Sequence, residues 1–349
     1  MENQVLEVDL ASELSNTPDA RVFTHGSLFA GIGGICTSFN SLGVVNEFTN
    51  ELEDKVLKTY QKNHFSKSLL GGSIRDLSAA KLPSIDILHG GFPCQSFSIA
   101  GLRGGFNDPR GQLFFEITRL ISEYGDRKPK VLVLENAPNL LTGESGSWFR
   151  KITMELSKLG YWFDQVNALL LNTAEHTGIP QSRERLFMVC LNSDFFDSNP
   201  IRQVDFKKVP LRPLSEFIFP FEEVDPRYYL DPENKYSRLI MEKENKSDPY
   251  QIYQLRRFEV RLASAGMCPT LTANMGHGGH NVPFIITNGR VRKLTERECL
   301  NIQGFDKQFS FPESITTGVK YAMIGNAVSP PVSKLIATRV LSLLRENDV

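Results

Sequence analysis

The sequence predicts a doubly wound α/β fold, in which helices cover both faces of a mostly parallel sheet. Apolar runs in the first half of the chain lack polar alternation, as strands do when both of their faces are buried. Segments with helical periodicity separate these runs, which indicates repeated strand–helix units. A chain of 349 residues is also long enough to bury such a core and to carry a second domain.

Each element is predicted from a local pattern. The strand at 21–29 leads into a glycine turn that opens the next helix. The helix at 52–63 places its apolar side chains at positions 52, 56, 57 and 60, which lie on one face. The strand at 85–90 stops at two glycines, and the strand at 130–135 is almost wholly aliphatic. In chain order we expect strands at 21–29, 44–50, 85–90, 130–135, 162–171 and 186–191, and helices at 33–42, 52–63, 112–124, 148–159, 295–304 and 331–345.

The composition is that of an ordinary globular protein. Hydrophobic residues make up 41% and charged residues 23%, which excludes a disordered or fibrous chain. The five cysteines form no CxxC pair, which argues against a disulfide framework or a zinc cluster. No apolar run approaches the ~18 residues of a membrane span, and the acidic segment 1–20 does not resemble a secretory signal. We therefore expect a soluble cytoplasmic protein with a poorly ordered leader at 1–20 and no metal.

A second, irregular domain is expected at 192–291, inserted between 21–191 and 292–349 of the first domain. Proline pairs break this part of the chain repeatedly, and no strand–helix rhythm continues through it. Residues 251–293 hold six basic side chains against one acid, a local net charge of +5, although the whole chain carries −1. On charge alone, a solvated face is the favoured interpretation. The basic residues are Arg256, Arg257, Arg261, Arg290, Arg292 and Lys293, and the acid is Glu259.

A glycine-rich turn, 29–34, directly follows the first strand and opens a helix. Glycines at such a place allow a ligand to approach the backbone closely at a helix N-terminus. Glu51 ends the next strand about twenty residues later, where an acid holds ribose hydroxyls in nucleoside-binding α/β folds. A simple tight turn is the alternative. The pattern departs from GxGxxG, so an adenosine ligand other than a nicotinamide cofactor is favoured.

Three further segments carry candidate chemistry at strand ends. Cys94 lies in Gly-Gly-Phe-Pro-Cys, a rigid turn that would present a thiol, although most free cysteines are small buried hydrophobes. Glu135 ends the most apolar strand, where burial raises a carboxyl pKa, although an acid at a helix N-terminus is common. Arg183 and Arg185 precede a strand and are suited to orienting Glu135, or else to forming surface ion pairs.

Six motifs, in this order, resemble the DNA (cytosine-5)-methyltransferases of bacterial restriction–modification systems. The resemblance covers residues 22–190 and 292–345 and leaves the insert as the part that varies within that family. It implies a Rossmann-like sheet that binds S-adenosylmethionine, with a small, mostly β target-recognition domain. The motifs are at 26–34, 91–98, 135–138, 181–185, 294–305 and 325–328.

The resemblance implies a role for each catalytic candidate. Cys94 would add to carbon 6 of a cytosine that has been flipped out of the duplex. Glu135 would hydrogen-bond or protonate N3, and Arg185 would bind O2 and orient Glu135, with Arg183 as its neighbour. Carbon 5 would then take the methyl group of S-adenosylmethionine, and loss of the carbon 5 proton would expel Cys94.

The resemblance also implies contacts to the cofactor. Phe29, Gly31 and Gly33 match its methionine and backbone contacts, and Glu51 matches its ribose contact. Leu52 stands where the family often has a larger apolar residue against adenine. Ile74, Asn326 and Val328 complete the expected cofactor site. Ser73 replaces the family's usual acid beside the adenine amino group, and Asp76 lies two residues beyond a direct match.

Double-stranded DNA is the implied substrate, and the insert is its implied reader. Arg256, Arg257 and Arg261 are then expected to contact phosphates and bases. Ser98, Thr272 and Asn274 are further expected DNA contacts, and His277 with His280 forms a glycine-rich loop rather than a metal pair. The resemblance further implies a monomer, paired with a restriction endonuclease. An RNA cytosine methyltransferase and a binding module without turnover are the alternatives.

Overall fold

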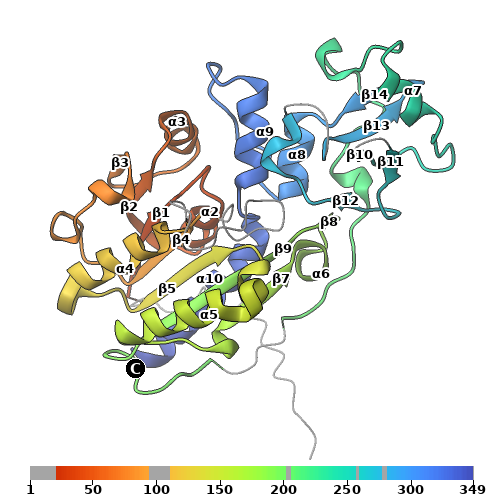
Figure 1. Ribbon diagram of the computed structural model, residues 1–349. Coiled ribbons are helices and arrows are strands. Elements are labelled where there is room, and N and C mark those ends of the chain that lie inside the picture. The colour runs from red at the N-terminus through yellow and green to blue at the C-terminus, as the bar shows by residue number, and fades with distance from the viewer. Residues whose placement is uncertain (1–20, 94–110, 202–205, 257–258, 277–280, 349) are drawn as a thin grey trace, which may run out of the picture.

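A mixed eight-stranded sheet forms the centre of the larger part of the molecule. The computed structural model describes residues 21–93, 111–201, 206–256, 259–276 and 281–348. The strand order is β3-β2-β1-β4-β5-β9-β6, and β7 also pairs with β9 (Figure 1). The strands are β1 (Thr24–Leu28), β2 (Val45–Glu51), β3 (Leu69–Gly71), β4 (Ile87–Gly91), β5 (Val131–Asn136), β6 (Tyr161–Trp162), β7 (Ala168–Asn172) and β9 (Glu184–Asn192).

One strand runs against the others. The pairs from β3 through to β5 are parallel, as predicted, whereas β9 is antiparallel to β5, β6 and β7. The predicted strand at 162–171 is divided into β6 and β7. A short 3-10 turn at Gln165–Asn167 separates them, because Asp164 and Asn167 cap that turn reciprocally.

Helices cover both faces of the sheet, so the predicted doubly wound class is confirmed. Alternate residues of β5 face opposite ways: Leu132 and Leu134 pack towards α4 and α5, whereas Val131 and Val133 pack towards α2 and α10. Each face is thus closed by its own apolar cluster (Figure 1). The helices are α2 (Gly34–Ser41), α4 (Leu113–Tyr124), α5 (Asn139–Lys158) and α10 (Pro330–Asn347).

Four further helices belong to the larger part. The predicted helix at 52–63 is α3 (Asp54–Asn63), and the one at 295–304 is α8 (Glu296–Gln303). Two helices were missed: α6 (Thr173–Thr177), and α9 (Thr317–Asn326), in which glycines at 318 and 325 weaken the helical signal. The α5 helix begins earlier than predicted and has a non-helical step at residues 143–146.

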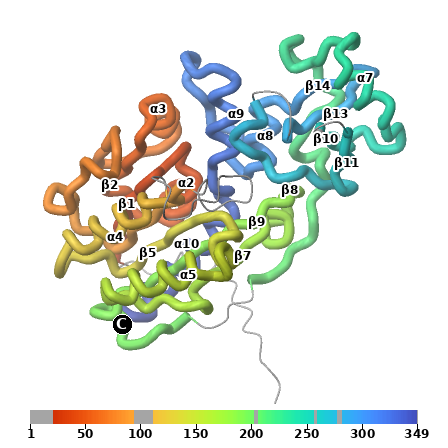
Figure 2. The backbone as a smooth tube through the Cα atoms, viewed as in Figure 1, coloured from red at the N-terminus to blue at the C-terminus, as the bar shows by residue number. Residues whose placement is uncertain are grey.

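A small antiparallel sheet forms the second part, which Figure 2 shows beside α8 and α9. Its order is β11-β10-β13-β14, and α7 (Lys235–Met241) packs against it. The register joins Gln254 to Pro283, so the end of β10 and the start of β11 lie where β13 starts. The strands are β10 (Tyr253–Arg256), β11 (Glu259–Leu262), β13 (Pro283–Thr287) and β14 (Arg290–Lys293).

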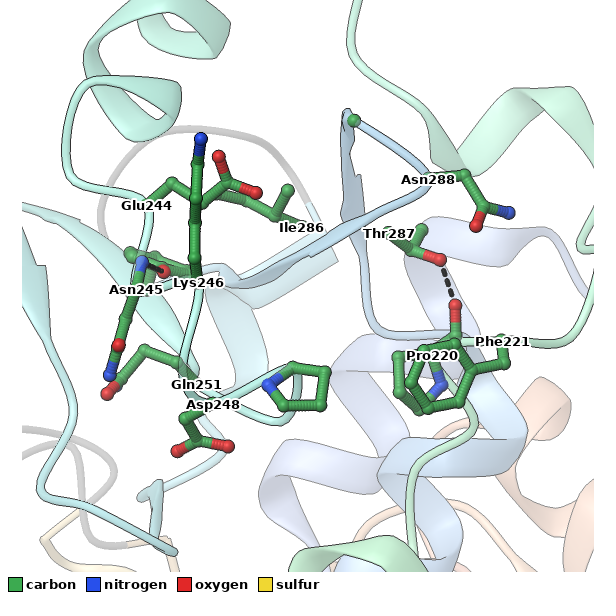
Figure 3. A pocket seen from close by; sticks show the side chains of 13 residues that line it. Pro220, Phe221, Glu244, Asn245, Lys246, Asp248, Gln251, Ile286, Thr287 and Asn288 are labelled. Atoms are coloured by element: carbon green, nitrogen blue, oxygen red, sulfur yellow. Dashed lines mark hydrogen bonds between the residues drawn. The ribbon is translucent and has the colours of Figure 1, made fainter.

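A hollow lies at the opposite end of the small sheet, beside the turn between β13 and β14. Its lining includes Asn245, Asp248 and Asn288 (Figure 3). Thr287 donates its hydroxyl hydrogen to the carbonyl of Pro220 there, which ties the segment around Pro220 to the end of β13. The hollow is therefore separated from the end of β10 by the length of the sheet.

The core of the insert is continuous with the helices that follow it. Ile218, Ile252 and Ile285 share one apolar cluster with Leu300 of α8 and Ile324 of α9. A short bridge of two strands, β8 (Gln181–Ser182) with β12 (Cys268–Pro269), also joins the two parts. A division at residues 192 and 291 stays a prediction, because this cluster crosses the second boundary.

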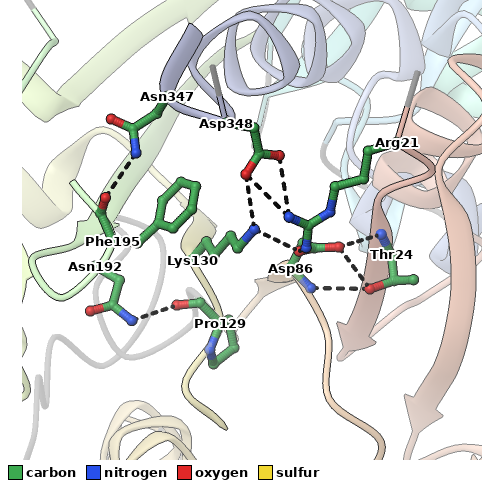
Figure 4. A network of polar contacts seen from close by, with 9 residues as sticks. All are labelled: Arg21, Thr24, Asp86, Pro129, Lys130, Asn192, Phe195, Asn347 and Asp348. Atoms are coloured by element: carbon green, nitrogen blue, oxygen red, sulfur yellow. Dashed lines mark hydrogen bonds and ion pairs between the residues drawn. The ribbon is translucent and has the colours of Figure 1, made fainter. Parts of the chain in front are cut away.

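Charged residues hold the two ends of the described chain together. Arg21 pairs with Asp86 at 2.9 Å and with Asp348 at 3.1 Å, and Lys130 reaches the same two carboxylates (Figure 4). The residues just before β1 and β4 and the residue after α10 thus meet at the edge of the sheet where β1 and β4 begin. None of the helices in the described ranges is both long and apolar enough to cross a membrane.

Candidate active site

The carboxyl ends of β1, β4 and β5 bring the predicted motifs to one edge of the sheet. Leu28 pairs with Gly90, and Gly91 pairs with Glu135, so the glycine turn, the Gly91 segment and the Glu135 motif start side by side. Ligands of open α/β sheets gather at this edge. Cys94 and Ser98 lie outside the described residues. The chain before Cys94 is held by Asn136, whose amide donates to the carbonyl of Phe92 at 3.1 Å.

Glu135 and Arg185 form an ion pair at this edge. Arg185 Nε lies 3.1 Å from Glu135 Oε1, and 11% of the Glu135 side chain is exposed. Burial raises the pKa of Glu135, while the charges of Arg185 and Arg183 oppose that rise. The pair exists because β9 is antiparallel to β5, which brings the beginning of β9 to the end of β5. A carboxyl whose pKa is raised by burial is suited to donating a hydrogen bond in its protonated form.

Gly91 sets the space beside this carboxyl. A Cβ atom on Gly91 would lie 2.7 Å from Glu135 Oε2 and 3.8 Å from Val328 Cγ2. Any larger residue would therefore displace the carboxylate. Val328 also packs against the glycine turn, because its carbonyl lies where a Cβ of Gly34 would be. Val328 thus joins the glycine turn to the Glu135 side of the site.

Arg183 is buried, with 1% of the residue exposed, and it joins the start of β9 to two segments that are distant in the sequence. Its guanidinium donates to the carbonyls of Leu271 at 2.8 Å, Gly325 at 3.1 Å and Ala327 at 2.8 Å. These contacts fit a residue that positions the 271–274 segment and the 325–328 motif. A direct catalytic role for Arg183 stays a prediction.

Glu51, the last residue of β2, is hydrogen-bonded to the glycine turn. Its Oε2 accepts the amide hydrogen of Gly31 at 2.9 Å, and its Oε1 accepts that of Glu53 at 3.1 Å. Burial raises the pKa of Glu51, while these backbone hydrogen bonds oppose the rise. A carboxylate offers about four acceptor positions, so both oxygens can still accept hydrogen bonds from hydroxyl groups.

The backbone of the turn is built for close approach by a ligand. Phe29, Gly31 and Gly33 all have positive φ, at 51°, 57° and 89°. Apart from Gly31 and its two neighbours in the chain, no atom of the described residues lies within 4 Å of the place that a Cβ of Gly31 would occupy. Leu52 is 66% exposed, an apolar surface next to Glu51. Together these residues fit a molecule with ribose hydroxyls and a flat apolar ring.

The other predicted cofactor residues differ in exposure. Ile74 and Val328 are buried, whereas Asn326 is exposed at the end of α9. The Ser73 hydroxyl accepts the amide hydrogen of Arg75 at 3.2 Å and so caps a short 3-10 turn. Asp76 is exposed.

The positive charge counted in the sequence is reduced in the structure. Arg292 is wholly buried and pairs with Glu298 at 2.8 Å, so it adds no charge to the surface. Arg261 is exposed but pairs with Glu259 at 2.8 Å. Arg290 stacks on Tyr229 at 4.1 Å, next to the hollow at the far end of the small sheet. The Arg292–Glu298 pair was not predicted; the Thr-x-x-Glu pattern at 295–298 signals only that Glu298 caps the start of a helix.

The remaining predicted DNA contacts lie on two segments. Arg256 ends β10, and Arg257 lies outside the described residues, as do His277 and His280. The described chain stops at residue 256 and starts again at residue 281, and both residues lie at the same end of the small sheet. Thr272 donates its hydroxyl hydrogen to Asn274 at 2.6 Å, in the segment that Arg183 holds.

A cluster of buried polar residues that no sequence motif indicated lies in the core beside α2. His25, Cys36 and His89 bring their nitrogen and sulfur atoms within 4.8 Å of one another. His25 bonds Asn40 at 2.8 Å and His89 at 2.9 Å. Two nitrogens bound to one tetrahedral zinc would lie about 3.3 Å apart, given Zn–N distances near 2.0–2.1 Å. The separation of 2.9 Å is that of a hydrogen bond, so we interpret the group as a buried hydrogen-bonded chain.

Comparison with known proteins identifies the family of this chain. A family model for C-5 cytosine-specific DNA methylase matches residues 23–342. Type II methyltransferase M.Bsp6I of Bacillus sp. (strain RFL6) is 39% identical over 318 residues, which cover 90% of this chain and 97% of that protein. Type II methyltransferase M.HhaI of Haemophilus parahaemolyticus is 31% identical over 331 residues, covering 91% of this chain and 94% of the relative.

Solved structures share the fold. The Entamoeba histolytica methyltransferase EhMeth superposes with a TM-score of 0.71 at 20% identity, over 93% of this chain and 99% of that one. A putative DNA modification methyltransferase encoded within an E. coli prophage gives 0.69 at 19% identity, over 93% and 99%. The match of the family model across nearly the whole chain, together with the identity to the two methyltransferases, shows that this chain belongs to the C-5 cytosine-specific DNA methylase family.

Proposed function

We propose that this enzyme methylates carbon 5 of a cytosine within a short duplex DNA sequence, with S-adenosylmethionine as the methyl donor. The observation that carries the proposal is the Glu135–Arg185 pair, which lies at the carboxyl edge of the sheet. The segment leading to Cys94 begins beside this pair, and Val328 contacts both Gly91 on this side and Gly34 of the glycine turn. The family match supports the reaction class.

The protein's own groups divide the chemistry between them. The thiolate of Cys94 forms a bond to carbon 6 of the cytosine, and Glu135 donates a hydrogen bond or proton to N3 as charge develops on the ring. Arg185 donates to O2 and holds Glu135 in place. S-adenosylmethionine would supply the electrophilic methyl group to carbon 5 and would leave as S-adenosylhomocysteine. A base then removes the carbon 5 proton, and the carbon–sulfur bond breaks to release Cys94 and the methylated base.

The glycine turn is the proposed cofactor site. Glu51 would accept hydrogen bonds from the ribose hydroxyls, and Leu52 would cover the adenine ring. Phe29, Gly31 and Gly33 would line the methionine end, with Ile74, Asn326 and Val328 completing the site. Support comes from the open space over Gly31 and from the exposed apolar side chain of Leu52.

The small sheet is the proposed reader of the DNA. The end of the small sheet that would contact the DNA is the one at which β10 ends and β11 begins, where Arg256 lies. Because a target base inside a duplex cannot meet both the thiol and the cofactor, the cytosine must be flipped out of the helix. We also propose that the enzyme acts as a monomer and protects DNA from a restriction endonuclease, as the Type II names of its relatives suggest.

The proposed reaction is tested by sequencing methylated cytosines in plasmid DNA that has been treated with the protein and S-adenosylmethionine. The proposal expects methyl groups on carbon 5 in one short sequence context, and none with Cys94→Ala. Transfer to RNA but not to DNA would reject the proposed substrate. Cofactor binding without transfer to either nucleic acid would reject the proposed turnover.

The DNA-reading end is tested by two arginine variants. Arg256→Ala should weaken DNA binding and reduce the dependence of the affinity on salt concentration by about one counterion. Arg290→Ala is the matched control, because Arg290 stacks on Tyr229 next to the hollow at the other end of the small sheet. Equal affinity and salt dependence for Arg256→Ala and the wild type would reject the assignment.

A further inference from the structure

Three hydrogen bonds from described residues outside the glycine turn hold it in place. Besides the Gly31–Glu51 bond, the amide of Ala30 donates to the carbonyl of Asn50 at 3.1 Å. The third contact comes from His64, whose Nε2 donates to the carbonyl of Ile32 at 2.9 Å. The α2 helix that follows has Gly33 as its N-cap, with no side-chain cap of its own. The conformation of the turn therefore depends on these neighbours.

His64 also fills the space beside Gly33. A Cβ on Gly33 would lie 2.3 Å from His64 Nε2 and 2.5 Å from Cδ2. The imidazole thus touches the turn at two consecutive residues, through a hydrogen bond at Ile32 and through van der Waals contact at Gly33. A ring in this place therefore limits the conformations open to the Ile32–Gly33 backbone.

The histidine is itself fixed by the end of α3. Asn63 exchanges two hydrogen bonds with the backbone of Ser310, at 2.8 and 2.9 Å, and Lys62 donates to the carbonyl of Phe311 at 2.9 Å. The imidazole packs between the rings of Tyr60 and Phe309, with centroids 4.7 and 6.2 Å away. The α3 end is therefore anchored to the connection between α8 and α9, and it presents His64 in one orientation.

We infer that His64 is a positioning residue for the cofactor site, and that it acts by holding the Ile32–Gly33 backbone in the ligand-binding conformation. It forms no part of the proposed transfer chemistry, which involves Cys94, Glu135 and Arg185. Loss of its hydrogen bond should therefore weaken cofactor binding and raise the KM for S-adenosylmethionine, while kcat changes little. The inference rests on the proposed function, because it takes the glycine turn as the cofactor site.

Two variants separate the hydrogen bond from the packing. His64→Phe keeps an aromatic ring against Gly33, Tyr60 and Phe309 but has no donor for the Ile32 carbonyl. His64→Gln places an amide nitrogen near the position of Nε2 and loses the ring. The probe is S-adenosylhomocysteine, titrated by calorimetry into the full-length protein, and thermal unfolding without ligand reports whether each variant is folded.

We expect His64→Phe to bind the probe about tenfold more weakly, as for the loss of one hydrogen bond. His64→Gln should recover most of that loss, and kcat should stay within about twofold of the wild type in both. His176→Phe is the matched control, since His176 bonds the backbone of Asn172 next to α6. Wild-type affinity in His64→Phe, or a fall in kcat without a rise in KM, would overturn the inference about His64 alone. Failure of the wild-type protein to bind the probe would instead reject the proposed cofactor site, and with it this assignment.

Discussion

Arg185 Nε lies 3.1 Å from Glu135 Oε1, although fifty residues of chain separate the two side chains. The reversed direction of β9 makes this contact, because it returns the chain to the carboxyl edge at which β5 ends. Arg185 limits the rise of the Glu135 pKa that burial causes, and it fixes the orientation of the Glu135 carboxylate. The pair is therefore the part of the site in which electrostatics and fold topology are most directly linked.

Replacing Arg185 by Gln should change both the rate and its pH dependence. Burial raises the pKa of Glu135 and Arg185 opposes the rise, so the pKa should rise further in the variant. In the proposed mechanism the protonated acid donates to N3, so activity falls as the pH rises through this pKa. We expect kcat/KM to fall by about 100-fold or more, and its alkaline limb to move to higher pH. Methyl-transfer rates from pH 6 to 10 measure both effects; an unshifted limb would contradict the assigned role of Arg185.

Gly91→Ala should damage the site while leaving the fold intact. Its Cβ would lie 2.7 Å from Glu135 Oε2, so the carboxylate must move. We expect kcat to fall by about tenfold or more, because the donor to N3 is misplaced. Gly71→Ala, on β3, is the control, since its Cβ meets Leu57 at an ordinary 3.4 Å. Equal activity in the two variants would show that the space beside Gly91 is not needed.

Leu52→Trp should strengthen cofactor binding. Leu52 is 66% exposed beside Glu51, and a larger ring would cover more of the adenine proposed to lie there. We expect the affinity for S-adenosylhomocysteine to increase about threefold to tenfold, measured by calorimetry. Leu262→Trp adds the same ring on the small sheet, where the leucine is 45% exposed, and should have no effect. Weaker binding by Leu52→Trp would place the adenine elsewhere.

Glu298→Gln should destabilise the whole protein. The Arg292 and Glu298 side chains are 0% and 1% exposed, and the carboxylate also accepts hydrogen bonds from Phe219 and Thr295. Loss of its charge leaves a buried guanidinium without its partner, which costs about 3–5 kcal/mol. Urea unfolding measures the change. Glu259→Gln breaks the exposed pair with Arg261 and should cost less than about 1 kcal/mol; similar losses in the two variants would contradict the prediction.

The histidine chain beneath α2 should make the fold sensitive to acid. Burial lowers the pKa of His25 from 6.5 to about 4 and lowers that of His89 well below 6.5. Below pH 6.5 the unfolded chain therefore binds protons that the folded protein does not, so the free energy of unfolding falls as the pH falls towards 4. Each histidine contributes a slope of up to about 1.4 kcal/mol per pH unit. Urea unfolding at pH 7.5, 6 and 5 measures the slope, which His89→Leu should reduce; an unchanged slope would exclude the histidine contribution.

The sequence predicted the parts of the site that depend on neighbouring residues. The strand, the glycine turn and Glu51 lie within thirty residues, and their patterns are local. The pairing of β9 could not be predicted in the same way, because strand direction is set by distant contacts. Arg292 was counted as surface charge, since a charge count does not show that Glu298 meets it in the core. His64 gave no signal, because its role depends on the approach of the end of α3 to Ile32.

The contact between Arg21 and Asp348 has a consequence for the order of the segments along the polypeptide. The side chains of Arg21 and Asp348 meet at 3.1 Å, so the two ends of the described chain lie near each other, and a linker that replaces residues 1–20 can join them without moving the sheet. New ends can then be opened at the exposed residues Ser264 and Ala265, between β11 and β12. In such a circular permutant the glycine turn would follow Val328 in the chain instead of preceding it, yet it would still pack against the same carbonyl. The catalytic assembly is thus defined by its arrangement in space, and a rearranged gene can encode it.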